Sequence, residues 1–183
     1  KKRTITGYYA AGEKADYYAD RLRVDNGSYL FDYIGKDVEI RDLRMCFPGR
    51  VNVENATAAI TVALYAGVTP EEIRVALPLF KGVSRRFDVH AKGDRLIYID
   101  DYAHHPREIE ASLSSIREMW PDKRLTVAFQ PHLYSRTNDF YPEFAKSLNL
   151  ADQVILLDIY PAREQPIPGV TSGLIAERLT VPF

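Results

Sequence analysis

The sequence is poor in cysteine and has no long apolar run. Cys46 is the single cysteine among 183 residues, so no disulfide can form within the chain. No apolar stretch approaches the ~18 residues that a membrane-spanning helix requires, and no segment resembles a secretory signal. We therefore expect a reducing, cytoplasmic environment and no membrane partner.

An excess of charge of one sign is also missing. The chain has 24 lysines and arginines against 25 aspartates and glutamates, which leaves a formal net charge of −1. A balance this close to zero gives no reason to expect a nucleic-acid partner or an anionic membrane surface. Binding of an anion must then depend on a local cluster of basic groups.

Several catalytic motifs are absent or broken. No Gly-x-Ser-x-Gly turn supports a serine hydrolase, and no Cys-x-x-Cys or His-x-x-x-His pair completes a metal site. Residues 7–14 resemble a phosphate-binding loop, but Glu13 stands where its lysine belongs, and Ala15 stands where a serine or threonine would hold Mg²⁺. We interpret this segment as a surface turn and assign no metal ligand.

Residues 1–47 have the alternating pattern of an antiparallel β region, with strands expected at 3–8, 17–24 and 29–34. The sequence Asp-Asn-Gly-Ser at 25–28 is a strong hairpin signal, because Asn and Gly both tolerate positive φ. The many tyrosines of this region are expected to cover sheet faces rather than to stack on nucleic-acid bases.

A helical pair follows. Its first helix is expected over 53–66, with Gly67 ending it. The second helix has an almost complete start signal: Thr69 as N-cap, Pro70 as first residue and Glu72 as the capping-box partner. This pair joins the β region in one α+β unit.

The small polar segment 81–84 favours a domain boundary, which divides residues 1–83 from residues 84–183. Two polar groups near it have open interpretations. Arg86, which stands next to Arg85, has either a solvated side chain or a guanidinium that binds a polyphosphate. Asn55 is either a solvated residue near a helix start or an amide that pairs with a purine edge.

Beyond residue 90 strands and helices alternate, which is typical of an α/β fold with a doubly wound, mainly parallel, Rossmann-like sheet. Strands are expected at 95–100, 124–129 and 153–159, buried on both faces, and helices at 106–120, 138–149 and 171–179.

Polar clusters follow each of these three strands: residues 100–105, 130–136 and 158–164. Carboxyl ends of parallel strands meet on one rim of a sheet, where ligands bind. His105 falls at the N-cap and Pro106 at the first position of a helix, whose N–H groups are then expected to face an anion. The alternative interpretation is that the residues of these clusters only cap helices and cover the surface of a structural sheet, without binding a ligand.

Five segments in order resemble the ATP-dependent Mur ligases of bacterial peptidoglycan synthesis. They are Pro48–Ala56, Ser84–Asp88, Asp100–Pro106, Phe129–Thr137 and Asp158–Glu164. The third and fifth segments resemble the alanine-adding branch of the family. The resemblance implies ATP and Mg²⁺ as cofactors, and UDP-N-acetylmuramate and L-alanine as substrates. The carboxylate of the first is phosphorylated by ATP and then attacked by the amine of the second, which releases ADP and phosphate.

The resemblance also assigns residues. It implies that Asn55 contacts adenine, Arg86 the ATP phosphates and Asp101 the ribose. It places four further side chains against UDP-N-acetylmuramate or the incoming amino acid: His104, His105, His132 and Arg136. No residue is assigned as catalytic.

Two positions depart from the family pattern. Val51 stands where a histidine is common, and Leu133 where an arginine is common, which removes one anion contact. The chain resembles the end of the central ATPase domain joined to most of the carboxyl-terminal domain, with a hinge near Gly82. We expect most Mg²⁺ ligands in a preceding part of the protein, and no activity from this fragment alone. A non-catalytic nucleotide-binding module and a metal-dependent phosphoesterase are the rival functions.

Overall fold

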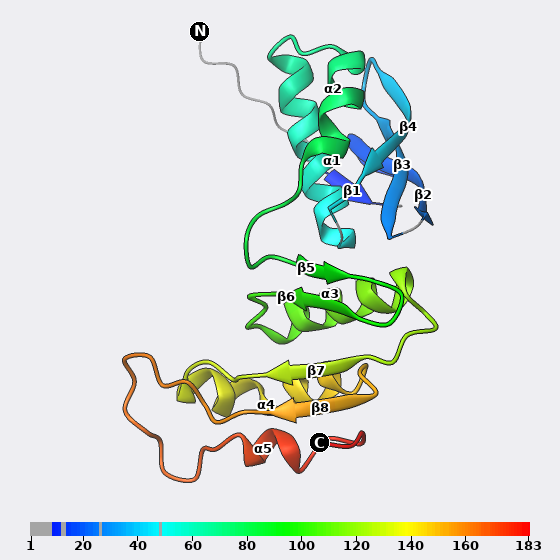
Figure 1. Cartoon of the computed structure of the whole chain (residues 1–183). Helices are drawn as coiled ribbons and strands as arrows, with labels where there is room; N and C mark the ends of the chain where they lie inside the picture. The colour runs from blue at the N-terminus through cyan, green and yellow to red at the C-terminus, as the bar shows by residue number, and fades with distance from the viewer. Residues whose placement is uncertain (1–8, 12–13, 26, 48) are drawn as a thin grey trace, which may run out of the picture. The chain divides into compact units, whose positions relative to one another are not determined.

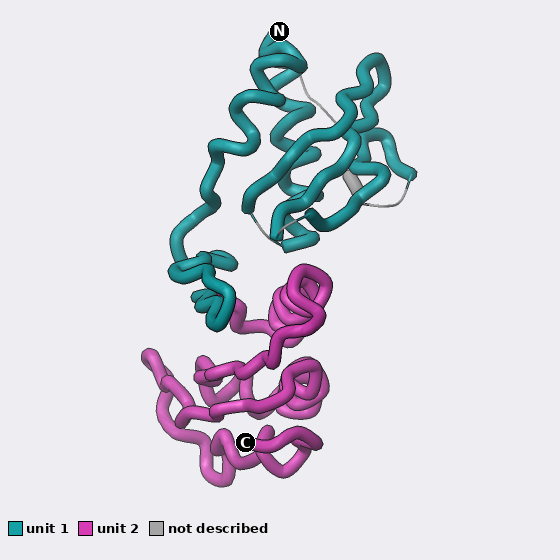
Figure 2. Tube along the Cα trace, turned by 45° about the vertical axis from the view of Figure 1, so that its right-hand side comes forward, with its two compact units in different colours: residues 1–100 teal, residues 101–183 magenta. Residues whose placement is uncertain are grey.

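A computed structural model describes residues 9–11, 14–25, 27–47 and 49–183. The chain divides into two compact units, with the boundary between Asp100 and Asp101 (Figure 2). The predicted strand at 3–8 and half of the segment 7–14 lie outside the described residues. Residues Tyr9–Ala11 of that segment form a strand, so the interpretation of the segment as a surface turn was wrong there. No helix among the described residues is long and apolar enough to cross a membrane.

The first unit is built on a four-stranded sheet in the order β1-β2-β3-β4 (Figure 1). Its strands are β1 (Tyr9–Ala11), β2 (Tyr17–Asp25), β3 (Ser28–Ile34) and β4 (Glu39–Met45). The predicted hairpin is confirmed, since Asp25 pairs with Ser28 and Gly27 has a φ of 71°. The sequence interpretation missed β4, because its charged residues hide the alternation of apolar ones.

Two helices cover one face of this sheet: α1 (Arg50–Tyr65) and α2 (Pro70–Ala76), which continues into the short 3₁₀ helix η1 (Leu77–Leu79) (Figure 1). Tyr29 and Tyr33 are fully buried, and the Tyr33 hydroxyl lies 2.8 Å from the hydroxyl of Thr61 on α1. The tyrosines therefore cover a sheet face, as predicted. The predicted cap of α2 is confirmed in full, with Thr69 and Glu72 exchanging hydrogen bonds.

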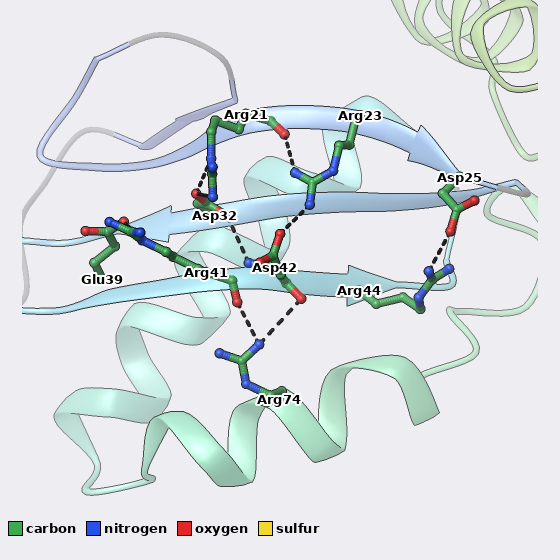
Figure 3. Close-up of polar contacts among 9 residues, drawn as sticks. All are labelled: Arg21, Arg23, Asp25, Asp32, Glu39, Arg41, Asp42, Arg44 and Arg74. Carbon is green, nitrogen blue, oxygen red and sulfur yellow. Dashed lines mark hydrogen bonds and ion pairs between the residues drawn. The ribbon is translucent and has the colours of Figure 1, made fainter.

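Charged side chains occupy the opposite face, around the buried Asp32 of β3 (Figure 3). Both neighbouring strands have an irregular register beside it, and Arg21 on β2 and Asp42 on β4 have positive φ values of 47° and 54°. Asp32 accepts hydrogen bonds from the Arg21 guanidinium at 2.5 Å and from the Asp42 backbone N–H at 2.9 Å. One carboxylate thus fixes two β-bulges.

The segment that follows η1 lies against the ring of Phe47. A Cβ atom added to Gly82, which has a φ of +93°, would lie 2.0 Å from Phe47 Cε2. Phe80 packs edge-on against the same ring, with centroids 5.7 Å apart. The antiparallel strands β5 (Asp88–Lys92) and β6 (Ile97–Asp100) complete the unit.

The second unit pairs β7 (Thr126–Phe129) with β8 (Gln153–Leu156) in parallel and packs three helices against them. The helices are α3 (Pro106–Met119), α4 (Tyr134–Leu148) and α5 (Gly173–Ala176). Their shared core includes Leu113, Phe144, Val154 and Ile175. Parallel strands between helices confirm the α/β fold class.

Four expectations about the region after residue 90 and about α1 need correction. The strand expected at 95–100 forms β6, which pairs antiparallel with β5 in a sheet separate from the parallel sheet of β7 and β8. The strands are not buried on both faces, since alternate side chains of β8 such as Ile155 are half exposed. Helix α4 begins at Tyr134 rather than 138, so Ser135 and Arg136 belong to its first turn. Helix α1 begins at Arg50 rather than 53, because the periodic pattern starts only after its polar first turn.

Candidate functional site

The polar segments that follow β7 and β8 lie side by side, as the topology predicts. The backbone N–H of Tyr160 donates to the Pro131 carbonyl at 2.8 Å, and the Leu133 N–H donates to the Tyr160 carbonyl at 3.0 Å. The Gln130 amide donates to the Asp158 carbonyl at 3.2 Å. The parallel pairing therefore continues beyond the strands, and we name residues 130–136 and 158–164 together the rim.

His132 is held on the rim by an aromatic contact. Its ring stacks on the ring of Tyr160, with centroids 5.5 Å apart and planes at 28°. His132 is partly buried, whereas Tyr160 is about half exposed. The stack fixes the face of the imidazole and leaves its edge to hydrogen-bond, which suits a group that contacts a ligand.

The N-terminus of α4 is capped from a distant part of the chain. Leu133, at the N-cap, has a φ of 74° and supplies no side-chain bond. Glu164 accepts hydrogen bonds from the Ser135 hydroxyl at 2.5 Å and the Ser135 N–H at 3.0 Å. The Ser135 hydroxyl, and then its N–H, lower the pKa of Glu164 below the ordinary value.

Arg136 lies in the same helical turn. Its Nη1 atom is buried and has no hydrogen-bond partner among the described residues. A buried guanidinium nitrogen without an acceptor is unfavourable unless an anion satisfies it. The two oxygens of the nearby Glu164 are taken by Ser135, so the rim keeps a basic group with unused hydrogen-bonding capacity.

The N-terminus of α3 differs from the prediction. His105 is the N-cap and Pro106 the first residue, as expected. The N–H groups at this end, however, already have acceptors within the chain. The Arg107 N–H donates to His105 Nδ1 at 3.3 Å. The N–H groups of His104 and His105 donate to the Glu108 carboxylate at 2.9 and 3.1 Å. The expectation of an anion against the helix N–H groups was wrong, because His105 accepts from the Arg107 N–H through Nδ1 and from the Glu108 N–H through its carbonyl. The Glu108 side chain completes a capping box that the sequence interpretation overlooked.

The side chains of His104 and His105 have separate surroundings. His104 Nδ1 lies 2.9 Å from the Tyr102 carbonyl and 3.4 Å from Glu108. The His105 ring lies 5.1 Å, centroid to centroid, from the ring of Phe140 on α4. Phe140 stands four residues after Arg136 and so shares its side of the helix, which brings His105 toward the same side of α4.

Asp101 is partly buried, and its carboxylate accepts a hydrogen bond from the Ser112 hydroxyl on α3. That contact fixes one oxygen and leaves the other for a further donor, which is compatible with the ribose contact that the family resemblance implies.

Asn55 and Arg86 belong to the first unit. Asn55 is exposed on α1 and its amide donates to the Asn52 side chain at 3.3 Å. Arg86 is exposed in a turn that its N–H closes onto the Val83 carbonyl at 3.1 Å. The residues on either side of Arg86 have φ values of 60° and 50°, so this turn holds two non-glycine residues in the left-handed region.

Comparison with known proteins gives the family. The family model described as "Mur ligase, glutamate ligase domain" matches residues 85–182, which is more than half of the chain. This chain belongs to the Mur ligase family. Among the described residues, no group of three or more histidine, cysteine or acidic side chains is placed to hold a metal ion.

Two relatives of this chain are named for the same activity. The chain is 47% identical over 174 residues to UDP-N-acetylmuramate--L-alanine ligase of Parabacteroides distasonis, which is 95% of this chain and 38% of that protein. It is 49% identical over 172 residues to the ligase of the same name from Phocaeicola vulgatus, again 38% of that protein. The chain therefore spans well under half the length of these relatives.

Solved structures agree on the fold. The UDP-N-acetylmuramate-alanine ligase of Thermotoga maritima superposes with a TM-score of 0.74 at 27% identity, over 92% of this chain and 36% of that one. A folylpolyglutamate synthase from the same organism superposes with a TM-score of 0.68 at 19% identity, over 96% of this chain and 40% of that one, which shows a shared fold alone.

The sequence interpretation missed the groups that hold the rim together. Glu164 and Tyr160 lie within a predicted polar cluster, but nothing local indicates their partners, which lie 29 and 28 residues earlier in the chain. Glu108 was detectable, since a glutamate three residues after a helix N-cap is the capping-box signal.

Proposed function

We propose that this chain is part of an ATP-dependent ligase that joins L-alanine to UDP-N-acetylmuramate. The observation that carries the proposal is the identity of 47–49% to ligases of that name, over 94–95% of this chain. The reaction transfers the γ-phosphate of ATP to the muramate carboxylate. The amine of L-alanine then attacks this acyl phosphate, forms the amide bond and expels phosphate.

In this proposal the rim binds an anionic group of a substrate. Arg136 donates through its buried Nη1, and the edge of the His132 ring supplies a second donor. The partly buried His104 and His105 line the same substrate from the start of α3. Fixed donors of this kind stabilise charge that develops at the reacting carboxylate without reorganising during the reaction.

ATP binding is assigned to three residues. The exposed guanidinium of Arg86 pairs with phosphate, the amide of Asn55 pairs with adenine, and Asp101 accepts from the ribose. Mg²⁺ neutralises the phosphate charge when it binds. We place most of its ligands in a part of the protein outside this chain, because the described residues hold no cluster of three metal-ligating side chains.

The domain division belongs to the same proposal. We assign residues 1–83 to the end of a central ATPase domain and residues 84–183 to a carboxyl-terminal ligase domain. The start of the family match at residue 85 supports this boundary, which lies before the division of the chain into compact units between Asp100 and Asp101. The contact between Gly82 and Phe47 anchors the connecting segment on the first side of this boundary. We also propose a cytoplasmic location, because the proposed substrates include nucleotides.

A reconstitution tests the proposal. This chain is mixed with a separately produced amino-terminal part of the ligase to give a two-part enzyme. ADP release is then followed with ATP, UDP-N-acetylmuramate and L-alanine. We expect alanine-dependent ADP release that Arg86→Ala or His132→Ala abolishes and that Arg95→Ala, at an exposed arginine, preserves. This chain alone should release none.

Two results would contradict the proposal. Association of the two parts with saturable ATP binding but no turnover would indicate a non-catalytic nucleotide-binding module. Phosphate release from simple phosphoesters that depends on Mn²⁺ or Zn²⁺ would indicate a phosphoesterase.

A further inference from the structure

The cap of α4 is the starting point for a role that no sequence pattern assigns. Four N–H groups at a helix start need acceptors, and Leu133 at the N-cap offers none from its side chain. Glu164 supplies the acceptor from 29 residues away. Because a cap of this kind is not local, it fixes the position of a loop as well as the start of a helix.

Glu164 is itself held in place at two points. Its N–H donates to the Pro161 carbonyl at 2.9 Å, in a turn where Ala162 has a φ of 52°. Four residues earlier, Tyr160 pairs by its backbone with Pro131 and Leu133. The segment 160–164 is therefore fixed against the start of α4 at both of its ends.

The arrangement controls what the neighbouring Arg136 can bind. The negative charge of Glu164 is close enough for Arg136 to contribute to lowering the pKa of Glu164. The oxygens of Glu164 nevertheless bond to Ser135, and Arg136 Nη1 has no partner in the described part of the chain. By binding both oxygens of Glu164, Ser135 leaves the Arg136 guanidinium available to bind an anion of the substrate.

We propose that Glu164 is a positioning residue: by binding Ser135 it fixes the first turn of α4 and holds Arg136 ready for a carboxylate or phosphate of the substrate. The proposal rests on the function proposed above and adds a residue to it. Glu164 itself does not contact the substrate in this arrangement.

The kinetic test uses the two-part enzyme with Glu164→Gln, whose amide can accept only through one oxygen and keeps the size of the side chain. We expect the KM for one of the two substrates that carry a carboxylate, L-alanine or UDP-N-acetylmuramate, to rise about fivefold, the size of losing one helix cap. The KM for ATP should stay within about twofold, since a cap loss acts within its own helical turn. Which KM rises identifies whether the anion at Arg136 is the amino-acid carboxylate or belongs to the nucleotide sugar.

Matched variants separate positioning from general destabilisation. Ser135→Ala should raise the same KM as Glu164→Gln does, whereas Ser135→Thr, which keeps a hydroxyl, should have the KM of the parent enzyme. The double variant Ser135→Ala with Glu164→Gln should have a KM no higher than that of Glu164→Gln alone, because both changes remove the same contact. Glu110→Gln, at an exposed glutamate of α3, should match the parent protein. An equal rise in all three KM values, or a fall in kcat alone, would overturn the proposal.

A second measurement needs no turnover and uses this chain as it stands. The NMR signals of the Arg136 Nε–H group and the Ser135 amide should shift and broaden in Glu164→Gln and not in Glu110→Gln. An unchanged Arg136 signal would overturn the proposal. If the unaltered two-part enzyme shows no alanine-dependent turnover, the proposed function fails while this measurement still decides whether Glu164 positions Arg136.

Discussion

Asp32 on β3 accepts a hydrogen bond from the backbone N–H of Asp42 on β4 at 2.9 Å, and this bond joins the two strands at an irregular point of their register. Asp42 has a φ of 54°, so its N–H does not follow the regular ladder and needs an acceptor. The same carboxylate binds Arg21 on β2, and only 2% of the Asp32 surface is exposed. A single acidic side chain therefore holds three strands together.

Replacing this carboxylate should destabilise the first unit. We expect Asp32→Asn to lower the free energy of unfolding by about 2 kcal/mol, because it removes a charged acceptor from a buried position, although Arg21 is half exposed to solvent. Urea unfolding of the chain measures this. Glu39→Gln breaks the exposed pair with Arg41 and should cost less than about 0.5 kcal/mol. Equal effects of the two changes would contradict the role of Asp32.

The contact between Gly82 and Phe47 predicts a second difference. Gly82→Ala forces a Cβ atom into the Phe47 ring and an alanine into a positive φ, so we expect a loss of about 3 kcal/mol. Gly67→Ala is the matched control, because Gly67 has a similar φ of +95° and no atom within 4 Å of an added Cβ. It should cost about 1 kcal/mol in the same urea titration. If both changes cost the same, the ring contact contributes nothing.

The carboxylate of Glu108 predicts a dependence of stability on pH. Burial disfavours its charged form, but hydrogen bonds from His104 and His105 N–H and the charge of His104 outweigh this and lower the pKa of Glu108 below 4.5. A lowered folded-state pKa gives stability that is present above pH 4.5 and is lost as the pH falls through the folded pKa.

Glu108→Gln tests this dependence. Thermal unfolding between pH 7 and pH 3 should show a smaller acid-induced loss of Tm in Glu108→Gln than in the parent chain. The exposed Glu110→Gln should keep the parent's pH profile. Identical profiles for the parent chain and Glu108→Gln would show that the α3 cap does not titrate in this range.

The stack of His132 on Tyr160 predicts how the NMR signals of His132 respond to changes at Tyr160. Tyr160→Phe keeps an aromatic ring over the imidazole, whereas Tyr160→Ala removes it. The ring-proton NMR signals of His132 should therefore stay near their original positions in the first variant and move downfield in the second. Tyr160 is half exposed, so neither change should unfold the chain. Unmoved signals in Tyr160→Ala would exclude the stack in solution.

Local signals predicted the elements that depend on local physics. Thr69, Pro70 and Glu72 specify a helix start within four residues, and the Asn-Gly hairpin connects strands through its own turn geometry. The order of strands and helices after residue 90 predicted that residues 100–105, 130–136 and 158–164 meet on one rim. The last two segments do meet, because parallel strands bring their carboxyl ends to one edge. The strand before residues 100–105 instead pairs antiparallel with β5, outside the parallel sheet.

Contacts between distant residues decided the rest. Helix α4 begins at Tyr134 with a cap from Glu164, and the boundary predicted from local pattern missed it by four residues. The charged alternation of β4 gave no strand signal, and the tertiary structure places its Asp42 beside Asp32. Sequence by itself determined the fold class, the family resemblance and the candidate residues, since these depend on periodicity and motif. Only the tertiary structure decided which polar groups are satisfied by the chain and which, like Arg136 Nη1, are not, because hydrogen-bond partners are chosen by distance in space.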